Sequence, residues 1–364
     1  MLERFGHGGD LQTAEETYGF MKSDFLDYSS NMNPLGPPPA VRETLIHYAD
    51  HIERYPDPIA RGLRRKLAER YSVDSSSLLA GNGGAELIDL AVRWLKPTRV
   101  VTAAPCFSEY GDAVRKIGAE LLEVPLKASS GFQIDEEWMN EAMKYGGSAL
   151  YILGSPNNPT GRLVHPDQIR RLLEAGAFVV LDEAFIDFVA EAERYSLIQE
   201  ASAHKRLLVI RSMTKFYAIP GIRLGFIAAH PDSISELSRL QVPWSVNSLA
   251  QQIGEAVLDD REFEEKSLTW LHQERPKLAN SLSSLGFNVY ESSANYLLLQ
   301  MQDAMGFSAG ELQEAMGRRG FLIRNASLFA GLNERYIRVA VKLEEQNRQF
   351  ISSLQACLLE KRGR

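Results

Sequence analysis

The sequence predicts an α/β protein whose mostly parallel sheet is covered by helices, followed by a smaller α+β domain. Between about residues 78 and 229, short apolar runs alternate with helical stretches, which is the order typical of parallel sheets. Polar residues gather just past the ends of these runs. After Pro243 the order changes to a long helical stretch that precedes mixed strands and helices. These observations favour two domains in the 364-residue chain.

The composition argues against several classes of function. The chain is 45% hydrophobic and 24% charged, and its net charge of −7 gives no electrostatic reason to expect binding to nucleic acid or membranes. The cysteines, Cys106 and Cys357, lie far apart and no metal-ligand spacing is present, so we expect neither a disulfide framework nor a metal site. Residues 1–10 lack the apolar core of a signal peptide, and no run of 18 apolar residues occurs. We therefore expect a cytoplasmic protein.

The chain begins with an expected irregular arm, residues 1–25, which contains a short helical stretch and a glycine-rich turn at residues 7–9. A short strand follows from Leu26 and runs into a turn rich in Asn, Pro and Gly. Three prolines separate this turn from an expected helix over residues 40–52. His7 in the arm is either a solvated histidine, which its spacing alone favours, or a ligand-binding group.

The alternating region is expected to form a large domain, residues 50–245, while residues 26–49 and 246–364 form the small domain. The expected strands of the large domain lie at residues 78–80, 99–103, 121–125, 149–153, 177–181, 207–210 and 224–229. Its expected helices lie at residues 59–71, 85–95, from 105 onward, 136–145 and 166–175. Ligands of such sheets bind outside the carboxyl ends of the strands. The residues expected at these ends are Gly83–Ala85, Asn158, Asp182 and Lys215.

Beyond the large domain we expect one long helix from about Ser248 to Leu285, with the length of a spine between two domains. Strands are expected near residues 287–290, 294–300, 321–324 and 335–341. Helices are expected near residues 308–318 and 343–360. This order predicts a second, smaller α+β domain.

A glycine-rich loop, residues 81–84, separates an expected strand from an expected helix. Free backbone N–H groups and the helix dipole make such a helix start favourable for an anion. Glycine-rich turns are common, so the motif alone is equally compatible with an ordinary turn. Its value rises when it is combined with the segment around Lys215.

Lys215 lies in a tight connection between two apolar runs, 207–210 and 224–229, and its neighbours are mostly apolar or aromatic. Burial lowers the pKa of a lysine, and a neutral amine can react with an aldehyde. Ser212 and Arg223, three residues before and eight after the lysine, are residue types that hold a phosphate monoester. The alternative is a lysine at a strand end with its amine in solvent.

These residues resemble the pyridoxal-phosphate lysine segment of the aspartate aminotransferase superfamily, also called fold type I. The resemblance covers about residue 26 to the C-terminus and rests on the segments just described and on the motif Asn158-Pro159-Thr160-Gly161. It implies a mostly parallel seven-stranded sheet with helices on both faces, a smaller α+β domain, and pyridoxal 5′-phosphate as cofactor. The cofactor-binding residues that it implies are Tyr55, Gly83, Gly84, Ala85, Phe107, Asn158, Asp182, Ser212, Lys215 and Arg223.

Several of these residues receive specific roles from the resemblance. Asp182 pairs with the ring nitrogen of the cofactor and, with Lys215, is expected to be catalytic. Asn158 donates to the ring hydroxyl, and Phe107 stacks on the ring. Taken singly, Asp182 is better explained as a helix cap or the partner of a lysine. Asn158 alone could be a turn asparagine before proline, which is very common, and Phe107 alone could be a core phenylalanine. Tyr55 reaches the cofactor phosphate of a neighbouring subunit, which implies a homodimer with shared active sites.

Two families within the superfamily resemble the chain, the histidinol-phosphate aminotransferases and the L-threonine-O-3-phosphate decarboxylases. Both contain the segment at residues 54–58 and an arginine like Arg324, and both act on phosphorylated substrates. The chain is more similar to the decarboxylases, and the stretches that carry this similarity are residues 7–9, 30–36, 181–188, 211–225 and 323–327. Phe185 stands where many relatives have a tyrosine, so the tyrosine's hydrogen bond to the cofactor is absent.

The resemblance also assigns a substrate, a small phosphorylated amino acid. Arg338 matches the arginine that binds the substrate α-carboxylate in a bidentate manner. We expect Arg324, His7 and Asn33 to line a pocket for the substrate phosphate opposite Arg338, with Asn158 also close to the substrate.

Overall fold

The large sheet has seven strands, as predicted. The computed structural model describes residue 2 and residues 7–362. The strand order is β2-β8-β7-β6-β5-β3-β4. The bounds are β2 Leu78–Gly81, β3 Arg99–Ala104, β4 Glu120–Pro125, β5 Leu150–Gly154, β6 Phe178–Asp182, β7 Leu207–Ser212 and β8 Gly225–Ala229. Strand β8 runs antiparallel to both of its neighbours, while the other strands run in one direction. This arrangement confirms the mostly parallel sheet.

The strands of the large sheet are buried on both faces, because alternate residues point to opposite sides. In β7, Leu207 and Val209 pack on one face, while Leu208 and Ile210 pack on the other. One face is covered by α4 Gly84–Leu95, α5 Ser108–Lys116 and α10 Pro231–Leu240. The other face is covered by α6 Glu136–Ala142, α7 Pro166–Glu174 and α9 Ile198–Ala203. Helices on both faces are therefore confirmed, although α9 and α10 were not among the expected helices.

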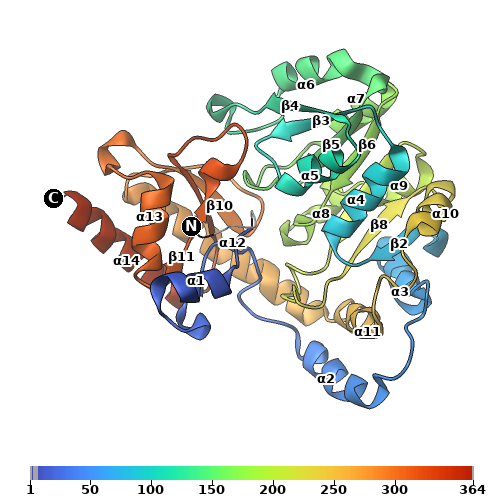
Figure 1. The fold of residues 1–364 in the computed structure, drawn as a ribbon, viewed down its shortest axis with the longest axis horizontal. Helices are drawn as coiled ribbons and strands as arrows, with labels where there is room; N and C mark the ends of the chain where they lie inside the picture. Colours follow the sequence, from blue (N-terminus) through green and yellow to red (C-terminus); the bar gives the residue numbers. More distant parts are fainter. Residues whose placement is uncertain (1, 3–6, 363–364) are drawn as a thin grey trace.

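Two smaller sheets lie beside the large one (Figure 1). The first has the order β12-β13-β10-β9, with β9 Asn288–Val289, β10 Tyr296–Gln300, β12 Arg324–Asn325 and β13 Tyr336–Ala340. The second pairs β1 Leu26–Asp27 with β11 Phe321–Leu322 in parallel. Helices α13 Ala309–Gly317 and α14 Glu344–Arg362 pack beside these sheets. Residues 26–27 thus lie beside the C-terminal third of the chain.

The remaining helices connect these parts. Helix α1 Leu11–Tyr18 is the short helix predicted for the arm, whose residues 1 and 3–6 lie outside the described residues. Helix α2 Pro39–Tyr48 lies against α11 Ser248–Val257 at one edge of the molecule (Figure 1). Helices α3 Arg61–Tyr71 and α8 Ala192–Tyr195 complete the large body. Within the part of the chain that the structure describes, no helix has both the length and the apolar character that a membrane crossing requires.

Two expected elements are wrong in detail. The single helix expected over 248–285 is divided into α11 and α12 Arg261–Ser284, because Asp260 accepts a hydrogen bond of 2.9 Å from the amide of Phe263 and starts a new helix. The strand expected near 321–324 is two short strands in different sheets, β11 and β12. The proposed boundaries between the large and the small domain stay a prediction.

Candidate active site

The candidate active site lies at the carboxyl ends of the parallel strands. Asp182 is the last residue of β6, Ser212 is the last residue of β7, and Lys215 follows in the loop toward β8. A pocket opens above Lys215 between the large sheet, the four-stranded sheet and the arm. Predicted residues that line it are His7, Phe107, Asn158, Lys215, Arg324 and Arg338. The fold thus gathers residues that are up to about 330 positions apart in sequence.

Lys215 is held among apolar and aromatic side chains. Its Nζ lies 3.3 Å from Ser212 Oγ and 5.8 Å from the ring centre of Phe185. Burial lowers the pKa of the Lys215 amine to about 8, with a further contribution from Arg223, while Asp182 opposes the shift. The amine is therefore still mostly charged near pH 7, but its neutral fraction is far larger than that of an exposed lysine, and the neutral form is the one that a nucleophilic lysine requires.

Asp182 is a buried carboxylate with defined donors. It accepts hydrogen bonds from the Tyr110 hydroxyl at 2.8 Å and from the Ala184 amide at 3.0 Å. Burial raises the pKa of Asp182, while Tyr110 and Lys215 act in the opposite direction. The role of Tyr110 was missed, because its contact with Asp182 depends on the folded proximity of β6 and α5 and has no local sequence signal.

Groups that suit an anion gather where the glycine loop meets the loop after β7. Gly83 has a φ of 84°, and a Cβ atom there would lie 2.5 Å from Arg223 Nη2. A Cβ atom on Gly84 would lie 3.9 Å from the Ser212 Cβ. Ala85 follows in the first turn of α4, where backbone N–H groups lack helical acceptors. These residues combine a guanidinium, a hydroxyl and a helix start at one point.

Two arginines form one wall of the pocket. Arg324 of β12 and Arg338 of β13 are directly paired across antiparallel strands, and their exposed fractions are 4% and 5%. Arg338 donates to Asn158 Oδ1 at 2.5 Å and to the Ser29 carbonyl at 2.6 Å, and Arg324 lies over the Phe329 ring. Like charges in opposed positions repel. Two guanidinium groups at one wall of a pocket suit an anionic ligand.

The arm forms a second wall. His7 Nε2 lies 2.9 Å from Glu109 Oε1 on α5, and the His7 ring centre is 6.0 Å from that of Phe107. Phe107 packs edge-on against Tyr110. His7 is therefore at the pocket and is not simply an arm residue in open solvent.

Asn33 was assigned wrongly to the substrate pocket. Its side-chain amide donates to the Phe216 carbonyl at 2.9 Å and to Ser267 Oγ at 2.8 Å, and its oxygen accepts from the Leu35 amide. These bonds turn the side chain into the protein interior, where it joins the Lys215 loop to α12.

Tyr55 is not brought to the site within one chain. Its exposed fraction is 84%, and its ring lies 5.4 Å from that of Trp244. The pocket around Lys215 does not include Tyr55 among its lining residues in the described chain.

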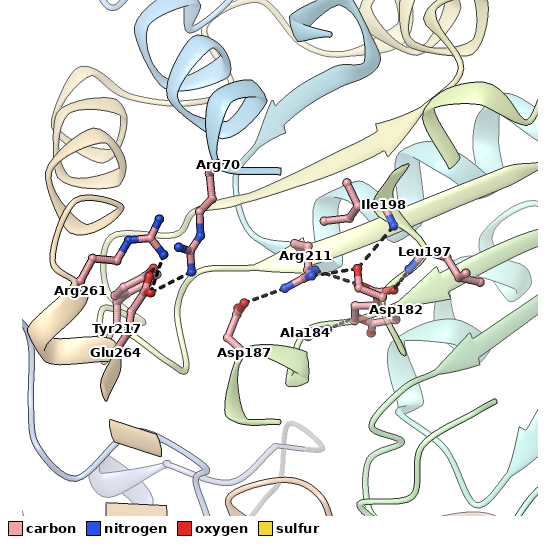
Figure 2. A network of polar contacts seen from close by, with 12 residues as sticks. Arg70, Asp182, Ala184, Asp187, Leu197, Ile198, Arg211, Tyr217, Arg261 and Glu264 are labelled. Atoms are coloured by element: carbon pink, nitrogen blue, oxygen red, sulfur yellow. Dashed lines mark hydrogen bonds and ion pairs between the residues drawn. The ribbon is translucent and has the colours of Figure 1, made fainter. Parts of the chain in front are cut away.

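A buried ionic network supports the ends of β6 and β7 (Figure 2). Arg211 donates to Glu183 Oε2 at 2.9 Å, to Asp187 Oδ1 at 2.6 Å and to Ser196 Oγ at 3.1 Å. Arg211 and Glu183 have exposed fractions of 3% and 0%. Arg211 directly precedes Ser212, and Glu183 directly follows Asp182. The ion pair between Arg211 and Glu183 therefore holds the backbone next to Ser212 and Asp182 in place.

A second cluster in Figure 2 holds the other end of the Lys215 loop. The hydroxyl of Tyr217 donates to Glu264 of α12 at 3.2 Å, and Arg70 of α3 pairs with the same carboxylate at 2.8 Å. The loop is thus anchored on both sides of Lys215.

Fold and site together define a fold-type-I transferase, with a lysine in the loop that follows one of the central strands. The family model described as aminotransferase class I and II matches residues 23–354. The chain therefore belongs to the class I and II aminotransferase family and is an enzyme.

Individual relatives narrow the comparison. The chain is 37% identical to the threonine-phosphate decarboxylase of Salmonella typhimurium, over 97% of this chain and 96% of that protein. The solved structure of L-threonine-O-3-phosphate decarboxylase from Porphyromonas gingivalis matches with a TM-score of 0.81 and 28% identity, over 92% of this chain and 99% of that one. The histidinol-phosphate aminotransferase from Clostridium acetobutylicum matches with a TM-score of 0.85 and 28% identity, over 92% and 99%. Decarboxylases and aminotransferases are thus both close in fold.

The pH dependence of stability tests the buried amine. In the cofactor-free protein, Lys215→Met should raise the free energy of unfolding at pH 7 by about 1–3 kcal/mol, because the wild type buries a charged amine. Between the folded pKa of about 8 and the unfolded value of 10.5, the unfolded chain binds more protons, so the wild type gains stability as pH rises. Urea unfolding should show the difference shrinking across this window. A difference independent of pH contradicts this account.

Stability also tests the ionic network. Arg211→Met should lower the free energy of unfolding by about 3–5 kcal/mol, because the fully buried carboxylate of Glu183 and the partly buried one of Asp187 are left without a cation. Lys205→Met, which removes an exposed pair with Asp232, is the matched control and should change stability by less than about 1 kcal/mol. Equal losses in the two variants would show that the network adds nothing beyond a surface pair.

Proposed function

We propose that this enzyme binds pyridoxal 5′-phosphate at Lys215 and decarboxylates L-threonine O-3-phosphate to (R)-1-amino-2-propanol O-2-phosphate, in cobalamin biosynthesis in the cytoplasm. The observation that carries the proposal is the pair of buried arginines, Arg324 and Arg338, at one wall of the pocket that contains Lys215. Threonine phosphate has a phosphate at one end and a carboxylate at the other, so one end can bind to each guanidinium group. The 37% identity to a threonine-phosphate decarboxylase supports the same reaction.

The residues present fit the proposed cofactor. Arg223, Ser212 and the start of α4 would hold its phosphate, since they provide a cation, a hydroxyl and free backbone N–H groups. Asp182 would hold the ring nitrogen, because a buried carboxylate whose pKa is raised by burial is stabilised by a cationic partner. Phe107 and Asn158 line the pocket where the ring and its hydroxyl would lie.

The chemistry that pyridoxal phosphate supplies when bound is an electron-accepting ring beside the substrate α-carbon. Arg338 binds the substrate carboxylate and Arg324, with His7, binds its phosphate, so the two ends of the substrate are fixed at once. This orientation decides which bond at the α-carbon breaks. The Cα–carboxylate bond breaks and carbon dioxide leaves. Lys215 in its ammonium form then donates a proton to the α-carbon, in the place that the carboxylate has left, because its pKa of about 8 lies close to physiological pH.

The second candidate function is that of a histidinol-phosphate aminotransferase. It is supported by the histidinol-phosphate aminotransferase of Oleidesulfovibrio alaskensis, which is 31% identical over 97% of this chain and 92% of that protein. Histidinol phosphate carries a phosphate and no carboxylate, so it engages one arginine of the pair. The co-substrate 2-oxoglutarate has two carboxylates that can engage both arginines, so the pair alone does not separate the two reactions. The higher identity to the threonine-phosphate decarboxylase of Salmonella typhimurium, 37% against 31%, favours the decarboxylase.

We also propose a homodimer whose active sites are shared. Tyr55 is highly exposed in the single chain, and other large apolar side chains around it are exposed as well. They are Ile52, Ile59, Val242 and Trp244. An apolar surface of this kind is suited to burial against a second copy of the chain. In such a dimer Tyr55 would complete the cofactor phosphate site of the partner.

The substrate is tested directly by product analysis. Purified enzyme with threonine phosphate and no 2-oxo acid should release carbon dioxide and form the phosphorylated amino alcohol, while transaminating histidinol phosphate poorly when 2-oxoglutarate is supplied. Gas release and mass spectrometry measure the two reactions. Fast transamination of histidinol phosphate without carbon dioxide from threonine phosphate would establish the aminotransferase instead.

The role of Arg324 is tested by Arg324→Ala. Activity on threonine phosphate should fall by a factor of about 100 or more, because the substrate phosphate loses its charged partner in a buried site. Bound-cofactor absorbance should be unchanged. The control is Arg318→Ala, an exposed arginine paired with Glu314, which should keep full activity. A loss of cofactor together with activity would move Arg324 from substrate to cofactor binding.

Shared sites are tested by mixing two inactive variants. Tyr55→Phe contributes an intact Lys215, and Lys215→Ala contributes an intact Tyr55, so a mixed dimer has one complete site. Random exchange should restore up to about a quarter of wild-type activity. Mass spectrometry should first demonstrate that the subunits have exchanged. If activity does not recover after that exchange, each site is built from one chain.

A further inference from the structure

The arm is docked on the turn at Ser29 by contacts that only glycine permits. Gly8 packs so closely that a Cβ atom there would lie 2.3 Å from the Ser29 carbonyl oxygen. The Gly9 amide donates to Ser29 Oγ at 2.9 Å, and Gly9 has a φ of 85°. The arm backbone therefore rests directly on the backbone of this turn.

The turn that receives the arm also holds Arg338. Asp27 fixes the turn by accepting hydrogen bonds from the amide and hydroxyl of Ser29 at 2.8 and 2.6 Å and from the hydroxyl of Ser30 at 2.6 Å. The Ser29 carbonyl in turn accepts a hydrogen bond of 2.6 Å from Nη2 of Arg338. The other terminal nitrogen of the same guanidinium group, Nη1, donates to Asn158. One carbonyl oxygen is thus in contact with Gly8 on one side and with the guanidinium on the other.

We infer that the arm positions Arg338 through Ser29 and so contributes to binding the carboxylate end of the substrate, in addition to presenting His7 to the phosphate end. The inference rests on the proposed function in taking Arg338 as the carboxylate-binding residue. Gly8 and Ser29 act as positioning residues, since their role passes through another side chain.

Glu109 holds the end of the arm that carries His7. Its carboxylate is the partner of His7 Nε2, and it lies on α5 in the large body, whereas Ser29 follows β1, which pairs with β11 of the small two-stranded sheet. The arm therefore spans the pocket opening from α5 to the turn at Ser29. Loss of Glu109 should release the His7 end while leaving the glycine contacts in place.

Calorimetric titration of the holoenzyme with two probes separates the two ends of the pocket. L-Threonine tests the carboxylate end, and inorganic phosphate tests the phosphate end. L-Threonine carries the carboxylate without the phosphate. Gly8→Ala should weaken the binding of L-threonine by about fivefold or more, because the added Cβ displaces the Ser29 carbonyl from Arg338. The binding of inorganic phosphate should weaken as well, because the displaced arm also carries His7 away from the pocket. Gly310→Ala is the control, since its Cβ would meet nothing closer than 3.9 Å, and it should bind both probes as the wild type does.

Glu109→Gln provides an independent variant with little risk to folding. It should weaken the binding of inorganic phosphate by about two- to fivefold, as expected for a partly exposed ion pair, and speed hydrogen exchange over residues 7–17. Asp112→Asn removes the same charge from the same helix without touching the arm and should change neither quantity.

Unchanged L-threonine binding in Gly8→Ala overturns the inference, because the arm would then serve the phosphate end alone. Unchanged hydrogen exchange in Glu109→Gln overturns the anchoring role of Glu109. Neither measurement uses turnover, so failure of the proposed decarboxylation is recognised separately by the absence of carbon dioxide release from threonine phosphate in the wild type.

Discussion

The burial of one amine beside one carboxylate is the interaction on which the rest of this structure depends. Lys215 and Asp182 lie at neighbouring strand ends, where burial lowers the pKa of the amine to about 8 and raises that of the carboxyl. A buried charge without a partner of opposite charge lowers the stability of the folded state, and this holds for each of the two groups. Their persistence in the interior requires a rigid surrounding, and the Arg211 network and the Tyr217 cluster provide it (Figure 2). The consequence is a lysine whose pKa of about 8 lies close to physiological pH.

The two sheet systems divide the chemistry between them. The ends of the large parallel sheet supply the amine, the carboxylate and the groups that suit an anion, which together are suited to a cofactor. The four-stranded sheet supplies the paired arginines, Arg324 and Arg338, and the arm supplies His7. Each wall of the pocket thus comes from a different part of the fold (Figure 1), and the hydrogen bond from Arg338 to Asn158 joins the arginine wall to the end of the large sheet.

Sequence patterns predicted the seven-stranded sheet and placed Lys215 and Asp182 at its strand ends, because apolar runs and strand termini are local properties. They failed where a role depends on distant contacts. Asn33 is bonded to Phe216 and Ser267 in the interior, although its residue type equally suits a ligand site. Tyr110 reaches Asp182 only after β6 and α5 have packed together. The break before α12 was also missed, since a single capping aspartate divides an otherwise continuous helical stretch.

The central claim is that Lys215 is the covalent attachment point of pyridoxal phosphate, and peptide mapping after borohydride reduction tests it most directly. Purified enzyme should be yellow, and reduction followed by proteolysis and mass spectrometry should find the pyridoxyl-phosphate mass on the peptide that contains Lys215. Lys215→Ala should carry no label. A label on another lysine, or a colourless protein that takes up no pyridoxal phosphate, would contradict the account.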